Sequence, residues 1–335
     1  MSETFEYPWH EKAWQDLSAR LDRVPHALLF HGPLGIGKLA LAERFARLLL
    51  CERRKAGRQA CGSCEGCRWF SAGQHPDLRF VEPEALARHA SAAAEDEGDG
   101  KPESGRKPST EIRIDQVRAL ETFLNVGGHR GGWRVALVHP AEDMNLHAAN
   151  ALLKSLEEPG PGTVFLLVSH RPARLAATIR SRCVPIPLAL PPAAASLHWL
   201  QEQGLREPGR WLAYAGGAPL RALALSAAGE LPIERVRRAL EAGDADSLAE
   251  VADPAGLESL VDALQKYALD RAFLACAGRA KYAPESRAGS AAGAGAWLGF
   301  ARGMGQRRAL ASRPLNPRLL AAEMIAAIPS TRGAA

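Results

Sequence analysis

Short apolar runs and amphipathic stretches alternate along the first half of the chain. Apolar residues recur at helical spacing in LALAERFARLLLC (39–51) and in LHAANALLKSLEE (146–158), and the second stretch stops before Pro159, which cannot continue a helix. Three compact apolar runs have the length of buried strands: HALLFHG (26–32), WRVALVH (133–139) and TVFLLVS (163–169). Strands that alternate with helices predict an α/β fold whose parallel sheet is covered on both faces.

The second half of the chain shows a different pattern. LALPPAAA (188–195) is typical of a domain boundary, and beyond it the apolar spacing is helical almost throughout. AGRAKYAPESRAGSAAGAGA (277–296) predicts a long loop between two of these helices. Residues 91–110 contain no aromatic residue and no Val, Ile, Leu or Met. We expect a disordered insertion there, because so little apolar surface cannot offset the entropy of ordering.

Composition narrows the class of protein. The 335 residues are 47% hydrophobic and 24% charged, which predicts a soluble globular chain long enough for two or three domains. Apolar runs such as VFLLV (164–168) are too short to cross a bilayer, and the first residues lack a basic segment followed by an apolar one. We therefore expect a cytoplasmic protein without membrane segments. A net charge of +5 is compatible with a polyanionic partner but does not indicate one.

Four of the six cysteines follow the spacing C-x9-C-x2-C-x2-C: Cys51, Cys61, Cys64 and Cys67. Four thiolates at this spacing predict a structural zinc site with no open position for a substrate. A cytoplasmic location disfavours disulfides. A ferredoxin-type cluster would need another cysteine where the chain has Ser71; such a cluster and thiol chemistry stay open as alternatives. His75 could replace one thiolate, but before Pro76 it is more typical of a turn.

The segment between the first strand and the first helix reads G-x-x-x-x-G-K and contains Gly32, Gly35, Gly37 and Lys38. In a phosphate-binding loop the glycines let the backbone wrap around phosphate oxygens, and the lysine reaches the β and γ phosphates. The next residue is normally Ser or Thr, whose hydroxyl binds Mg²⁺. Here it is Leu39, which cannot bind a metal ion.

A second part of the ATPase machinery is also missing. The strand that should end in the acids that orient Mg²⁺ and polarise water ends in His139 and Pro140. Glu142 and Asp143 follow at the wrong register and are more typical of a helix start. We therefore expect no ATP hydrolysis by this chain. Weak binding of a nucleotide or phosphate, and a loop kept for folding alone, are both consistent with the glycines and Lys38.

Further motifs cover most of residues 7–190. They are YPW (7–9), HALLFHGPLGIGK (26–38), the cysteine module with HPD (75–77), IRIDQVRAL (112–120), AANALLKSLEEP (148–159) and RLAATIRSRC (174–183). In this order and spacing the chain resembles the AAA+ clamp-loader subunits of bacterial DNA polymerase III, of the delta-prime type. The second half matches that family only in helical character and in LNPRLLAAEMI (315–325).

The resemblance implies a fold and a role. The fold would be an AAA+ RecA-like domain over 1–187 with a zinc module at 51–67, a helical lid domain over 188–230, and a helical collar over 231–335 that joins five subunits in a ring. The role would be that of a non-catalytic partner of ATPase subunits, in a complex that opens a sliding clamp and loads it on primed DNA. Through this complex the chain would belong to the polymerase III holoenzyme, a nucleotidyltransferase.

Ser181-Arg182-Cys183 matches the family's SRC motif. The resemblance implies that Arg182 reaches in trans into the ATP site of the neighbouring subunit as an arginine finger, where it stabilises the charge that develops on the γ-phosphate. A surface ion pair is the ordinary alternative for an arginine, and Arg180 is a second candidate.

Two sensor positions stay open. Ser169 ends the third strand, where related ATPases have a polar sensor residue, and a structural hydroxyl is the alternative. The family's lid arginine aligns with Leu220, and Arg221 is one step away, so we do not assign that role.

Two other functions compete with the clamp-loader reading. An active P-loop ATPase or nucleotide kinase is favoured by Gly32 to Lys38, but the missing hydroxyl and acids oppose it. A zinc-dependent DNA-binding module is disfavoured because no dense basic or aromatic stripe lies beside the cysteines.

Overall fold

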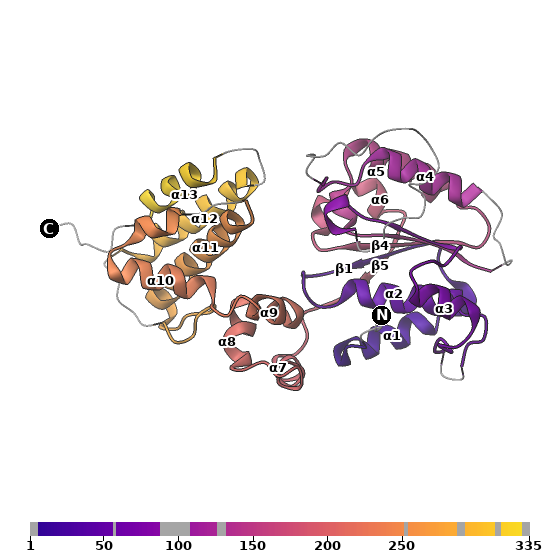
Figure 1. The fold of residues 1–335 in the computed structure, drawn as a ribbon, viewed down its shortest axis with the longest axis horizontal. Coiled ribbons are helices and arrows are strands. Elements are labelled where there is room, and N and C mark those ends of the chain that lie inside the picture. The colour runs from indigo at the N-terminus through magenta and orange to yellow at the C-terminus, as the bar shows by residue number, and fades with distance from the viewer. Residues whose placement is uncertain are drawn as a thin grey trace. The chain divides into compact units, whose positions relative to one another are not determined.

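The computed structural model describes residues 6–55, 58–87, 108–125, 132–250, 254–286, 292–311 and 316–329. The chain divides into two compact units, an α/β unit (Met1–Leu190) and a helical unit (Pro191–Ala335), and each is described by itself (Figure 1). The division falls inside the stretch 188–195. The disordered insertion expected at 91–110 lies outside the described residues except for its last three.

The α/β unit is built on a five-stranded sheet with the order β2-β3-β4-β1-β5. The strands are β1 (Ala27–His31), β2 (Leu78–Val81), β3 (Arg134–Val138), β4 (Thr163–Ser169) and β5 (Val184–Pro187). All neighbouring strands are parallel, and His31 of β1 is in register with Ser169 of β4. The carboxyl ends of the central strands therefore lie at the same end of the sheet, beside the loop that follows β1.

The three central strands were predicted from apolar runs, and the two edge strands were not. β5 reads VPIP, and its prolines Pro185 and Pro187 lack the N–H that a central strand needs. An edge strand that pairs only with β1 tolerates them. β2 is only four residues long, and Arg79 interrupts its apolar pattern.

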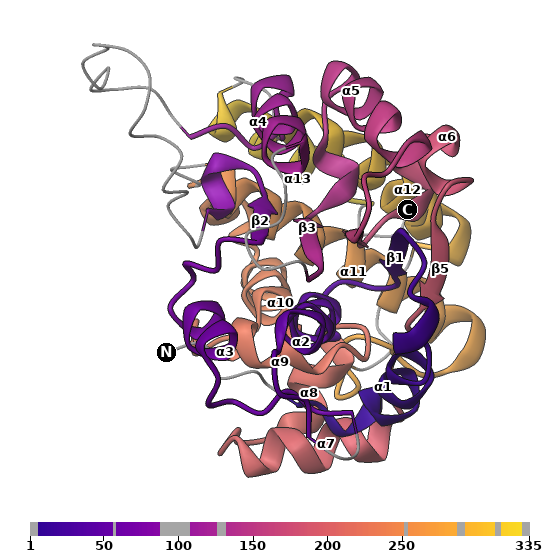
Figure 2. The ribbon, with the colours of Figure 1, turned by 90° about the vertical axis from the view of Figure 1, so that its right-hand side faces the viewer.

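Helices cover both faces of the sheet, as the alternating pattern predicts. Figures 1 and 2 show α1, α2 and α3 on one face and α4, α5 and α6 on the other. Their bounds are α1 Glu11–Ser18, α2 Lys38–Leu50, α3 Glu65–Ser71, α4 Ile114–Asn125, α5 Leu146–Glu157 and α6 Ala177–Arg180. Successive strand residues point to opposite faces, and both faces are buried, so the sheet reads as nearly continuous apolar runs.

The helical unit contains no strand within its described residues. Its helices are α7 Ala193–Glu202, α8 Pro208–Tyr214, α9 Pro219–Ser226, α10 Pro232–Ala242, α11 Pro254–Ala277, α12 Ala294–Ala311 and α13 Pro317–Ala326. Five of them begin with proline, which suits a first helical turn because no intrahelical partner is lost there. Residues of α8 to α13 contribute to one core that contains the fully buried Trp297. The loop predicted at 277–296 is confirmed at 278–286 and 292–293, whereas its ends at 277 and 294–296 belong to α11 and α12.

Asp262 on α11 joins several helices of this unit. Its carboxylate accepts hydrogen bonds from Lys266 at 2.6 Å, Arg308 of α12 at 2.8 Å and Arg221 of α9 at 3.1 Å. The Tyr214 hydroxyl of α8 donates to it at 3.3 Å.

Among the helices of the described residues, none is both long and apolar enough to cross a membrane.

Candidate functional site

The loop between β1 and α2 is tightly wrapped. Gly35 and Gly37 have φ angles of 83° and 88°, and Gly37 is the N-cap of α2. A side chain at Gly37 would place its Cβ 2.5 Å from the ring of Tyr7, and one at Gly32 would place its Cβ 2.0 Å from the carbonyl oxygen of Leu188. Glycine is needed at Gly37 for its positive φ and at both positions for space.

The segment before α1 packs on this loop. The indole Nε1 of Trp9 donates to the carbonyl oxygen of Ile36 at 2.9 Å, and the rings of Tyr7 and Trp9 are stacked with centroids 5.1 Å apart. His10 is buried beside them, and burial lowers its pKa to about 4. Aromatic side chains from the segment before α1 therefore pack on the loop. No local pattern in the sequence predicts this contact.

Lys38 is turned into the protein. Its side chain is 2% exposed, and Nζ donates to the carbonyl oxygen of Pro33 at 2.5 Å. Burial lowers the pKa of Lys38 to about 8, and the negative charge of Glu142 opposes that shift. The half-buried Leu39 follows in the first turn of α2 and offers only hydrocarbon where a metal ligand would be needed.

Two histidines face each other at the carboxyl ends of β3 and β4. The Nε2 atoms of His139 and His170 are 3.2 Å apart, and their rings meet edge to face. Burial, together with the charges of Lys38 and Arg171, lowers the pKa of His170 to about 4, so it is neutral at pH 7. Ser169 is fully buried at the end of β4. His139 thus follows β3 at the position where an ATPase needs a carboxylate, and the imidazole of His170 lies against it.

Glu142, the acid that follows β3, is held by backbone contacts. It lies in a short 3-10 helix, η5 (Ala141–Asp143), rather than at the start of α5. Its Oε1 accepts the backbone N–H groups of His170 at 2.9 Å and Arg171 at 3.0 Å. The buried carboxylate ties the end of β3 to the end of β4, which is a structural use that the sequence pattern did not reveal.

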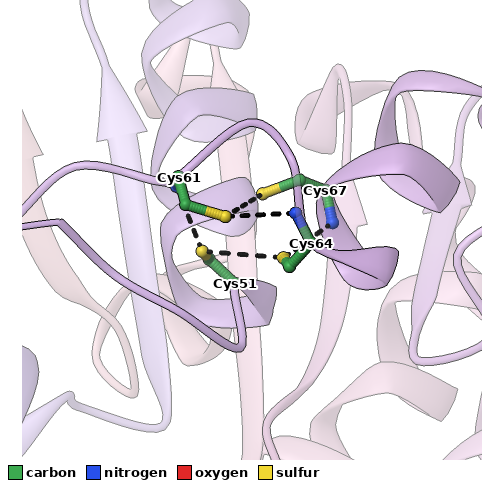
Figure 3. Close-up of side chains that lie close together, drawn as sticks. All are labelled: Cys51, Cys61, Cys64 and Cys67. Carbon is green, nitrogen blue, oxygen red and sulfur yellow. Dashed lines mark hydrogen bonds between the residues drawn. The ribbon is translucent and has the colours of Figure 1, made fainter.

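The four cysteines predicted as a metal site come together at the end of α2 (Figure 3). Cys51 follows α2, Cys61 lies in the connecting loop, and Cys64 caps α3, in which Cys67 lies. Their sulfur atoms all lie within 4.8 Å of one another, and none of the four forms a disulfide.

The chemistry of this donor set fits a tetrahedral metal ion. The sulfurs of Cys51 and Cys64 are 3.9 Å apart and those of Cys61 and Cys67 are 4.0 Å apart. Four sulfurs at the usual 2.3 Å from one zinc ion would be about 3.8 Å apart. The N–H groups of Ser63 and Cys64 donate to the Cys61 sulfur at 3.4 Å and 3.2 Å and favour its thiolate, whereas burial raises the pKa of Cys51 and Cys67. His75 is not part of the group: its Nδ1 accepts the N–H of Asp77 at 3.1 Å in a turn.

Each residue of Ser181-Arg182-Cys183 has a separate environment. Cys183 is buried in the core of the α/β unit. The Ser181 hydroxyl donates to the carbonyl oxygen of Thr178 at 3.0 Å and closes the end of α6. Arg182 is partly exposed, donates from Nη1 to the same oxygen at 2.9 Å, and forms an ion pair with Glu157 of α5. Arg180 is exposed. In the helical unit, Arg221 is paired with Asp262 at 3.1 Å.

Comparisons with known proteins point to one family. Residues 9–192, more than half of the chain, match the family described as "DNA polymerase III, delta subunit". The chain is 46% identical to the DNA polymerase III subunit delta' of Pseudomonas aeruginosa over 227 residues, which cover 67% of this chain and 62% of that protein. It is 37% identical to the subunit of the same name from Yersinia pestis over 232 residues, which cover 69% and 61%. The chain spans about three fifths of the length of these relatives.

A solved structure gives a weaker likeness. The "gamma subunit-related protein" of DNA polymerase III from Thermotoga maritima is 16% identical, covers 93% of this chain and 97% of its own, and has a TM-score of 0.45. That similarity is too low to add to the family assignment, which rests on the sequence matches. The chain belongs to the delta-prime family of DNA polymerase III subunits.

Proposed function

We propose that this chain is a non-catalytic subunit of a DNA polymerase III clamp loader. It joins other subunits in the ring that opens the sliding clamp and loads it on primed DNA in the cytoplasm, as part of a nucleotidyltransferase holoenzyme. The non-catalytic role is supported by the phosphate loop, which contains Lys38 but is followed by Leu39 in place of Ser or Thr. The neighbouring strand β3 is followed by His139, and Oε1 of the nearby Glu142 accepts backbone N–H groups.

We also assign each part of the chain to a domain of such a subunit. The α/β unit is the AAA+ RecA-like domain, residues 188–230 are the lid, and residues 231–335 are the collar that joins the ring. A nucleotide at Gly32, Gly35, Gly37 and Lys38 would be held weakly at most, because Lys38 is buried and hydrogen-bonded to its own loop.

We also propose that Cys51, Cys61, Cys64 and Cys67 hold a structural zinc ion. Bound there, the ion would crosslink the end of α2, the following loop and the start of α3. With four protein ligands it would have no open position for a substrate. Its contribution is therefore to folding.

Arg182 is the residue that we propose acts on ATP, in the site of a neighbouring subunit. It is partly exposed at the end of α6, as a residue that reaches another subunit must be. An arginine supplied in trans makes hydrolysis depend on assembly. An active ATPase site in this chain itself is the competing function, and it would need Lys38 rather than Arg182.

A reconstituted loader tests this directly. The ATPase subunits that do not adjoin this chain carry substituted P-loop lysines, so that turnover reports only the neighbouring site. With clamp and primed DNA present, we expect Arg182→Ala to slow that site about a thousandfold, within the range of known arginine fingers. Arg180→Ala, at an exposed arginine two residues away, tests the second candidate, and on this account it leaves turnover unchanged. Unchanged turnover in Arg182→Ala would overturn the trans role.

A further inference from the structure

The guanidinium of Arg182 is held from two sides. Nη1 donates to the carbonyl oxygen of Thr178 in α6, and Nη2 forms a charge-assisted hydrogen bond with Oε1 of Glu157, the last residue of α5. The two anchors come from different helices and restrain a long side chain that would otherwise sample many rotamers.

These contacts leave the guanidinium able to bind a further anion. An arginine side chain has five N–H donors, and the two contacts use two of them. Three donors remain for phosphate oxygens. Glu157 therefore does not have to release Arg182 before Arg182 can act.

The position of Glu157 is costly for its own helix. The C-terminal end of a helix carries partial negative charge, and acids there are unfavourable. α5 nevertheless ends in Glu157 and is capped by Glu158. Arg182 supplies a positive charge that offsets the conflict at Glu157.

We propose that Glu157 is a positioning residue that holds the Arg182 guanidinium in the orientation in which it meets the γ-phosphate of the neighbouring subunit. This inference rests on the proposed trans role of Arg182. The side chains of Arg182 and Glu157 are 35% and 49% exposed, so their ion pair contributes little to folding. Its effect should therefore be seen in catalysis rather than in stability.

The test uses the reconstituted loader with a single active neighbouring site. We expect Glu157→Gln to lower kcat about tenfold and to leave KM for ATP within twofold, because the arginine loses its preferred orientation and not its charge. Glu158→Gln, an exposed acid one residue further, is the matched control and should stay within twofold of the unmodified chain. Glu157→Asp keeps the charge and should recover part of the loss.

A double variant separates positioning from a general structural effect. If Glu157 acts only through Arg182, Glu157→Gln should cause no further loss in the Arg182→Ala background. An equal loss in both backgrounds would overturn the inference, as would a faster turnover in Glu157→Gln, which would mean that Glu157 restrains Arg182. If Arg182→Ala slows the site and Glu157→Gln does not, the inference fails and the proposed function stands. If Arg182→Ala has no effect, both fail.

Discussion

At the phosphate loop, Leu39 and His139 stand where Mg²⁺ chemistry requires a hydroxyl and a carboxylate. Leu39 replaces the hydroxyl, His139 ends the strand with an imidazole, and the Glu142 carboxylate is bound by two backbone N–H groups. Lys38 remains, but its ammonium group is directed to the carbonyl oxygen of Pro33.

Burial of Lys38 predicts a pH dependence of stability. Its pKa is about 8 in the folded chain and 10.5 for an ordinary lysine, so the unfolded chain binds more protons between these values. Through this group the free energy of unfolding should rise with pH across that window. The Lys38→Met variant has no titrating group at this position. The difference in the free energy of unfolding between this variant and the unmodified chain should therefore become more unfavourable for the variant from pH 8 to pH 10. Urea unfolding at several pH values measures this, and a difference independent of pH would contradict it.

At the scale of elements, the central strands and the strand–loop–helix order of the α/β unit follow from the sequence, because burial on both faces produces apolar runs. The edge strand β5 does not, since its prolines are tolerated only at an edge. The cysteine site could be predicted because its ligands lie within 17 residues. The Glu157–Arg182 pair and the packing of Trp9 on the loop could not, because the partners are 25 and 27 residues apart and meet only in the folded chain.

Zinc removal should weaken the elements that the cysteines join. We expect one zinc ion per chain by metal analysis, and a chelator should lower the unfolding temperature by about 5–15 °C, because folding loses the binding free energy of the ion. Cys64→Ala should lose the metal, whereas Cys276→Ala, at an exposed cysteine on α11, should keep it. The zinc site would be contradicted by a chain that contains no metal, or by an unfolding temperature that a chelator does not change.

At the scale of the whole molecule, the candidate chemistry lies in the α/β unit. The family match covers residues 9–192, which is nearly the extent of that unit, and the helical unit is organised around Trp297 and the Asp262 contacts. A unit with a degenerate loop and a partly exposed Arg182 is consistent with the proposed role as a subunit that completes the site of a neighbour. Hydrolysis should therefore be a property of the assembly and not of this chain.

Steady-state ATP hydrolysis by the purified chain with Mg²⁺, alone and at high protein concentration, tests that claim most directly. We expect no turnover above that of a Lys38→Ala preparation. Leu39 stands where the loop needs a hydroxyl and His139 where the strand needs an acid, so the chain lacks these ligands for the metal ion. Turnover that survives repurification and disappears in Lys38→Ala would contradict the claim. It would mean that the chain has a working ATP site of its own.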